Sequence, residues 1–125
     1  MRQSVIVLAL LSAALAGTTG MTAPAYAGSP NGTWLRSNGA HIEVFDCSGG
    51  IGMRVTKSPE PQKVGKQIMC GAKKTAENKW KGTLLNLDDG QNYSGYVELN
   101  GGSLTLSGCV LGGLICSNDT WSKIK

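Results

Sequence analysis

The chain has 125 residues, of which 41% are hydrophobic and 16% are charged, and its formal net charge is +4. This length suits one domain. The basic residues are spread along the sequence instead of forming a stripe with stacking aromatic residues, so we expect no nucleic-acid partner.

The start of the chain has the pattern of a secretory signal peptide. Arg2 supplies a positive charge, residues 5–16 are uncharged and mostly apolar, and small residues precede a cleavage point after Ala27. The apolar stretch is shorter than the roughly 20 residues that a membrane-spanning helix needs. We therefore expect residues 1–27 to be cleaved and residues 28–125 to form a single periplasmic or secreted domain, with no membrane span after cleavage.

The expected mature chain alternates between apolar and polar side chains and has almost no helical periodicity. Ile42 and Val44, for example, alternate with His41 and Glu43, as in an antiparallel strand with one buried face. Glycine-containing turns separate the extended runs. The pattern predicts about eight strands, over residues 32–36, 41–47, 50–56, 66–70, 79–86, 91–99, 102–108 and 119–124.

The segments between these runs are less regular. Residues 57–66 are predicted to be a loop, because Pro59 and Pro61 each lack a backbone N–H. Residues 71–78 are predicted to be a loop or a single helical turn.

Pairing of the first and last strands would remove the two exposed edges of an up-and-down sheet. Trp34 and Trp121, each preceded by threonine, lie on those two strands. We therefore expect an all-β fold, a small antiparallel β-barrel of about eight strands. The alternative is a sandwich or a half-open barrel.

Four cysteines remain after the expected cleavage: Cys47, Cys70, Cys109 and Cys116. An even number suits disulfides in an oxidising compartment, and four cysteines allow three pairings. Cys109 and Cys116 flank a short apolar connection, whereas Cys47 and Cys70 each end an earlier strand. We therefore favour Cys109–Cys116 together with Cys47–Cys70. Close Cys-x2-Cys pairs are lacking, so we expect neither a metal site nor a thioredoxin-type redox pair.

The sequence shows no catalytic constellation. His41 is the only histidine, so a Ser-His-Asp relay would depend on it, and it lies on the polar side of an expected strand. Asp88 and Asp89 are explained by a turn, and no glycine-rich phosphate loop precedes a helix. We therefore expect a protein that is not an enzyme and has no cofactor.

Several short motifs follow one another along the chain: Gly32-Thr33-Trp34, Ile42 to Cys47, Trp80-Lys81-Gly82, Asp89 to Gly95, Gly108-Cys109, Gly112-Gly113, Cys116 and Thr120-Trp121. In this order they resemble the bacterial domain-of-unknown-function family 2147, over essentially the whole of residues 28–125. The resemblance implies a small exported protein with a lipocalin-like β-barrel and no established activity. That family usually has a second cysteine where Gly52 stands here. Cys70 takes the place of that partner, which supports a bridge to Cys47.

The large side chains suggest where binding could occur. Trp34, Trp121 and Tyr93 are expected in the core, and small barrels have room for side chains or for one small ligand. We therefore hypothesise a non-enzymatic module that binds a small apolar or amphipathic ligand in the barrel mouth. The alternative is a structural or assembly factor that contacts a protein or glycan of the cell envelope. The candidate ligand or interaction residues are Trp80, Tyr96, Leu111 and Leu114.

Overall fold

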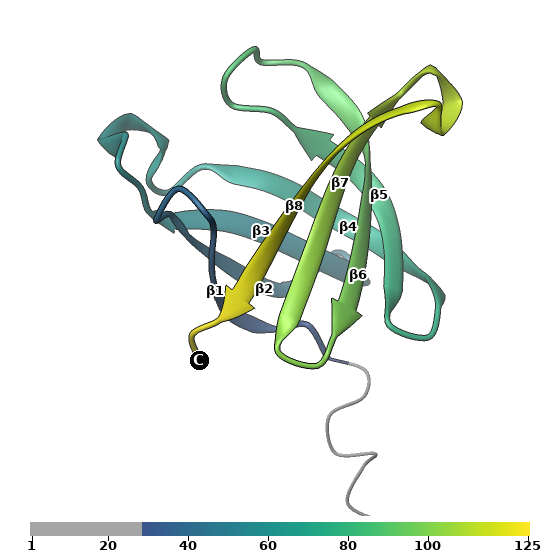
Figure 1. Cartoon of the computed structure of the whole chain (residues 1–125), viewed down its shortest axis with the longest axis horizontal. Coiled ribbons are helices and arrows are strands. Elements are labelled where there is room, and N and C mark those ends of the chain that lie inside the picture. The colour runs from purple at the N-terminus through teal and green to yellow at the C-terminus, as the bar shows by residue number, and fades with distance from the viewer. Residues whose placement is uncertain (1–28) are drawn as a thin grey trace, which may run out of the picture.

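The computed structural model describes residues 29–125, and the expected signal peptide lies outside the described residues. Eight antiparallel strands follow one another in chain order around a closed barrel (Figure 1). Short 3-10 helices, η3 and η4, lie in the connections after the third and seventh strands. The element bounds are β1 Gly32–Leu35, β2 His41–Cys47, β3 Gly50–Lys57, η3 Pro61–Lys63, β4 Gln67–Ala76, β5 Lys79–Leu85, β6 Asn92–Asn100, β7 Ser103–Val110, η4 Leu111–Gly113 and β8 Ile115–Lys123.

The first and last strands close the barrel, as the sequence predicts. Trp34 of β1 lies opposite Lys123 of β8, and Trp121 of β8 lies opposite Leu104 of β7. Both tryptophans are buried, and each indole N–H donates a hydrogen bond of 2.8 Å, Trp34 to the carbonyl of Pro30 and Trp121 to Asp119. The fold is therefore a closed barrel rather than a sandwich or a half-open one.

The inward side chains of the strands form one apolar core. Burial of each large aliphatic side chain contributes about 1.5–3 kcal/mol, so the core is the main source of stability. Glycines let the strands approach closely, because a Cβ at Gly82 would lie 2.7 Å from the Cβ of Ala72. The core comprises Trp34, Ile42, Val44, Ile51, Met53, Val55, Ile68, Met69, Ala72, Trp80, Val97, Leu99, Leu104, Leu106 and Trp121.

Two strands are longer than the sequence predicts. β4 continues to Ala76 instead of ending at residue 70, with Gly71 at φ 82° inside it, and pairs there with β5. β8 begins at Ile115 instead of residue 119, because its ladder with β7 runs back to the end of the hairpin. Both extra stretches are mostly exposed, so they lack the alternation that marks a strand with one buried face.

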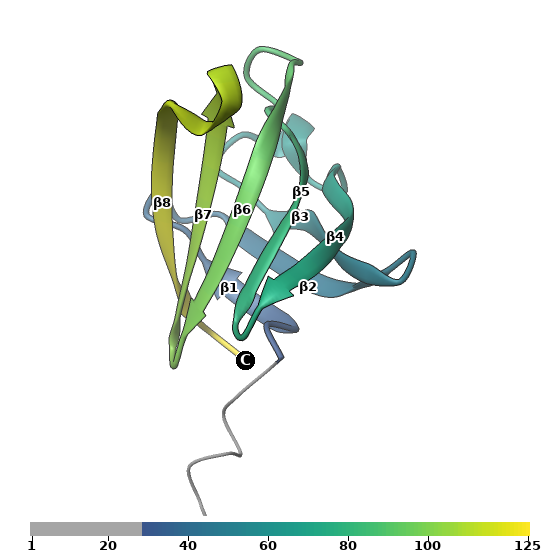
Figure 2. The same cartoon turned by 90° about the vertical axis from the view of Figure 1, so that its right-hand side faces the viewer.

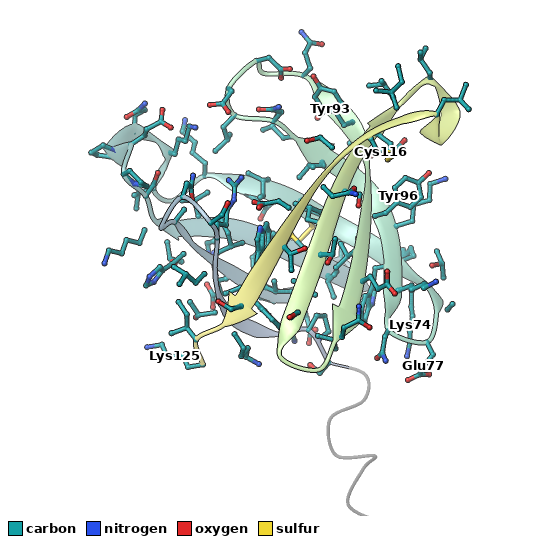
Figure 3. The ribbon with its side chains drawn as sticks, in the orientation of Figure 1. Lys74, Glu77, Tyr93, Tyr96, Cys116 and Lys125 are labelled. Atoms are coloured by element: carbon teal, nitrogen blue, oxygen red, sulfur yellow. A yellow bond between two sulfur atoms is a disulfide. The ribbon has the colours of Figure 1, made fainter. Side chains whose placement is uncertain are left out.

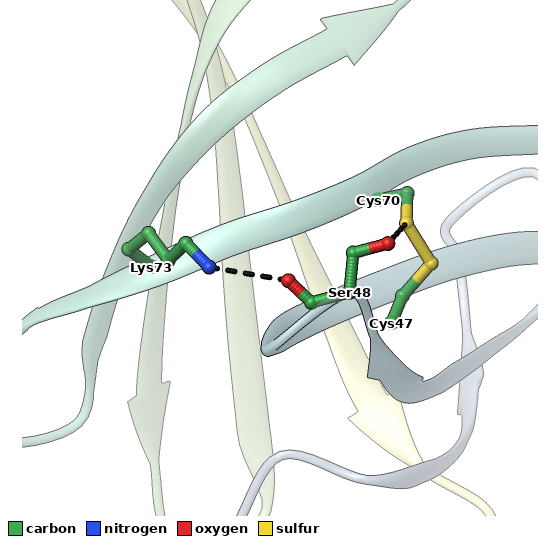
Figure 4. Close-up of a disulfide and its surroundings, with 4 residues drawn as sticks. All are labelled: Cys47, Ser48, Cys70 and Lys73. Atoms are coloured by element: carbon green, nitrogen blue, oxygen red, sulfur yellow. Dashed lines mark hydrogen bonds between the residues drawn. A yellow bond between two sulfur atoms is a disulfide. The ribbon is translucent and has the colours of Figure 1, made fainter.

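The two disulfides are Cys47–Cys70 and Cys109–Cys116, which confirms the favoured pairing. The first joins the end of β2 to β4, next to the turn at Ser48 (Figure 4). The Lys73 ammonium donates a 3.2 Å hydrogen bond to the Ser48 carbonyl. A Cβ at residue 52 would lie 2.7 Å from the Cβ of Cys47, so Gly52 leaves Cys47 free to reach across to β4.

A candidate ligand pocket at the barrel mouth

The two ends of the barrel differ. At one end lie tight turns and the C-terminus, whereas the longer connections gather at the other end (Figures 1 and 2). This loop end is called the mouth below. It carries the connections β1–β2, β3–β4, β5–β6 and β7–β8, over residues 36–40, 58–66, 86–91 and 111–114.

A pocket of about 320 Å³ opens at the mouth. This volume is at the lower end of the range of small-molecule sites. Deeper in the barrel the side chains of Val44, Met53 and Leu104 are almost completely buried and do not line the pocket, so the other half of the interior is packed with side chains. The floor of the pocket is apolar and consists of Val55, Ile68, Leu84, Leu87, Leu106 and Trp121.

Gly108 of β7 faces this pocket and leaves part of its space open. A Cβ built there would lie 3.3 Å from Cδ2 of Leu84 and 3.9 Å from the Cβ of Tyr93. A larger side chain at this position would therefore extend into the pocket.

Asp119 of β8 lies on the rim of the pocket and accepts three hydrogen bonds. Arg36 Nε and Trp121 Nε1 each donate to Oδ2 at 2.8 Å, and the Ser37 hydroxyl donates to Oδ1 at 3.3 Å. Burial raises the pKa of this carboxyl, but the hydrogen bonds from Trp121 and Arg36, together with the Arg36 charge, outweigh it. The pKa of Asp119 is therefore lowered, and the group is a carboxylate at neutral pH.

Lys63 joins two of the mouth connections. Its Nζ donates to Asp88 Oδ1 at 2.6 Å and to Glu60 Oε2 at 2.8 Å, which ties the β3–β4 connection to the β5–β6 connection. The hydrogen bond to Asp88, followed by the one to Glu60, raises the pKa of the ammonium group.

Tyr93 lies on the other side of the rim, near the start of β6 (Figure 3). It is half-buried rather than in the core, which corrects the expectation from sequence. Its hydroxyl donates a hydrogen bond to Asp89 Oδ2, because the phenol end of a rim tyrosine can reach the β5–β6 connection. This bond lowers the pKa of Asp89, to which the Gln91 N–H also donates, and raises the pKa of Tyr93.

The residues singled out from the sequence do not form one site. Trp80 is 5% exposed and belongs to the core. Tyr96 lies on the outer face of β6, where the Lys81 ammonium is 5.5 Å from the centre of its ring (Figure 3). Leu111 and Leu114 are exposed in the β7–β8 connection, and neither lines the mouth pocket. Trp80 and Tyr96 both border a separate depression of about 230 Å³.

The sequence pattern does not mark Arg36, Lys63 or Asp119 as rim residues. One signal was present, because Asp119 and Trp121 are two residues apart on a strand and therefore share a face. A carboxylate on the same strand face as a buried tryptophan indicates a polar group at the edge of the core. Arg36 and Lys63 lie in connections, and their partners depend on how the loops meet.

The described part of the chain contains no arrangement of His41 with an acid or a nucleophile, and no metal-binding cluster. The imidazole of His41 makes no hydrogen bond within residues 29–125. No group of three histidine, cysteine, aspartate or glutamate residues in this range is placed to hold a metal ion. Among the same residues, no helix has the length and apolar character needed to cross a membrane.

Comparison with known proteins gives one match. A family model described as "Uncharacterized protein conserved in bacteria (DUF2147)" matches residues 32–123, which is nearly the whole described barrel. No curated protein and no solved structure matches the chain. The chain belongs to this family of uncharacterised bacterial proteins.

Proposed function

We propose that the protein is an exported, non-enzymatic binding module that holds one small amphipathic molecule in the mouth pocket. The observation that carries the proposal is a pocket of about 320 Å³ with an apolar floor and a polar rim, in a barrel whose other half is packed. Apolar lining with a few placed polar groups is the usual composition of small-molecule sites.

The rim favours a ligand whose polar end makes hydrogen bonds without carrying a full charge. Arg36 is paired with Asp119, and Lys63 is paired with Asp88 and Glu60. An anionic or cationic ligand would have to compete with these pairs, whereas a hydroxyl or amide group can bond to them as they stand.

Export is supported by the two disulfides of the barrel. Such bridges persist in oxidising compartments and are rare in the cytosol. Together with the signal-peptide pattern of residues 1–27, they favour the periplasm or the exterior as the place of action.

The test uses N-phenyl-1-naphthylamine, an uncharged amphipathic fluorophore, titrated into the purified protein. We expect saturable binding at micromolar concentration. Gly108→Val places three further carbon atoms in the pocket, so it should weaken binding by about tenfold or more, equivalent to about 1.4 kcal/mol.

Gly102→Val is the matched control. Gly102 lies in the β6–β7 turn at the opposite end of the barrel, where no atom lies within 4 Å of an added Cβ. This variant should bind the probe as the unchanged protein does. The proposal is wrong if the unchanged protein fails to bind, or if Gly108→Val binds equally well while its circular dichroism spectrum is native.

A further inference from the structure

Half of β8 has a neighbouring strand on one side only. β1 has four residues and β8 has nine, and the ladder between them consists of two pairs, at Ser122 and Lys123. On its other side, β8 pairs with β7 from Ile115 to Ser122. In the described part of the chain, residues 115–118 therefore form an open strand edge, visible in Figure 1 as the upper part of β8.

The backbone groups of alternate residues on this edge point away from β7. Cys109 and Cys116 lie directly opposite each other with a Cα–Cα distance of 4.1 Å, which is typical of a non-hydrogen-bonded antiparallel pair. The N–H and C=O groups of Cys116 therefore point away from β7, and by alternation so do those of Asn118. Among residues 29–125, no backbone group bonds to them.

This edge lacks the usual protection against strand addition. Natural edges are blunted by lysine, proline or inward-pointing charges, but residues 111–118 contain no charge and no proline. Next to the edge is an apolar tip, defined here as Leu111, Leu114 and Ile115, whose side chains are 68%, 85% and 58% exposed. In strand addition, backbone hydrogen bonds provide affinity and side-chain contacts provide specificity. This edge offers both open backbone groups and exposed apolar side chains.

We propose that the β8 edge pairs with the same edge of a second copy of this chain, antiparallel about a two-fold axis at Ser117. In this register Cys116 of each copy lies opposite Asn118 of the other, and the two pairs make four backbone hydrogen bonds. A two-fold interface brings the same segment of both copies together. Residues 111–118 carry no charge, so no like charges meet across it.

The same arrangement gives the apolar tip a partner. Beyond the paired residues, the chain of one copy runs past Thr120 of the other copy and reaches the end of that copy's β1. There Leu35 pairs with Ser122 and is exposed. The tip of one copy then packs on Leu35 of the other, and symmetry repeats the contact. A single interface covers the exposed apolar side chains of both segments, which is why a second copy is favoured over an unrelated peptide.

Sedimentation equilibrium of the purified protein over a wide range of concentrations tests the proposal. We expect a reversible dimer. Asn118→Pro removes an N–H that does not bond to β7, and should weaken the dimer by about tenfold or more. The double variant Leu111→Ser with Leu114→Ser should weaken it to a similar extent. Val64→Ser, which changes an exposed apolar residue of the β3–β4 connection, should leave it unchanged.

Amide hydrogen exchange gives a second measurement that needs no variant. The amides of Cys116 and Asn118 should exchange more slowly as the protein concentration rises. The proposal is overturned by a monomer at all concentrations, by a dimer that survives both edge variants, or by exchange at these amides that does not depend on concentration. Ser117 and Asn118 of this edge also line the mouth pocket. No ligand is used in either measurement, so failure of the dimer is distinguishable from failure of ligand binding.

Discussion

At the scale of single residues, Asp119 connects the core to the rim of the pocket. Its carboxylate accepts a hydrogen bond from the indole of buried Trp121 and one from Arg36 of the β1–β2 connection. A buried N–H that loses its acceptor costs about 1–3 kcal/mol. Asp119 therefore supports both the position of Trp121 and the shape of the mouth.

This carboxylate makes stability depend on pH in a defined direction. The pKa of Asp119 is lower in the folded chain than in the unfolded chain, so the unfolded state binds more protons between the two values. The resulting stability is fully present above the unfolded pKa, near 3.8, and is lost as the pH falls through the folded value. Asp89 contributes in the same direction.

Asp119→Asn should lower the free energy of unfolding at pH 7 by about 1 kcal/mol, because the ion pair with partly exposed Arg36 is lost. It should also flatten the loss of stability below about pH 4. Urea unfolding followed from pH 2.5 to pH 7 measures both effects. Glu98→Gln is the control, since the Glu98 side chain makes no hydrogen bond within residues 29–125. A variant with the same acid sensitivity as the unchanged protein would contradict this role of Asp119.

At the scale of elements, the two disulfides hold different parts of the barrel. Cys109–Cys116 closes one hairpin between neighbouring strands, with a sequence separation of 7. Cys47–Cys70 links β2 to β4, with a sequence separation of 23. A cross-link that closes a longer loop restricts the unfolded chain more.

Replacing both cysteines of a pair by alanine should reveal this difference. In the chain-entropy model, loss of Cys47–Cys70 costs about 3.5 kcal/mol and loss of Cys109–Cys116 costs about 2.5 kcal/mol. Urea unfolding of the two double variants, with the spectrum of each checked by circular dichroism, gives the values. A larger loss for the 109–116 variant would show that the hairpin bridge acts mainly on the folded state.

How much the sequence predicts also depends on the element. β2 and β7 alternate apolar and polar residues because one face is buried, and their positions follow from this pattern. The ends of β4 and β8 are exposed on both faces, so the pattern is absent there and the strands are predicted too short. The contacts of the rim residues are still harder to predict from the sequence. Arg36 and Asp119 are 83 positions apart, and only the closed topology brings them together.

At the scale of the whole molecule, the barrel has a packed half and an open half. The tight turns lie at the packed end. Of the four longer connections at the other end, β1–β2, β3–β4 and β5–β6 line the mouth pocket. Barrels of about eight strands have an interior just wide enough for side chains or one small ligand, and this barrel divides its interior between the two. Binding at the mouth should therefore leave the deep core undisturbed.

Methyl NMR during titration with N-phenyl-1-naphthylamine tests this division directly. The methyl signals of Ile68, Leu84 and Leu106, which line the pocket, should shift in a saturable way. The methyl signals of Val44 and Leu99, in the packed core, should stay where they are. Shifts confined to the apolar tip, shifts spread equally through the core, or no saturable shift at the pocket would contradict a ligand site at the mouth.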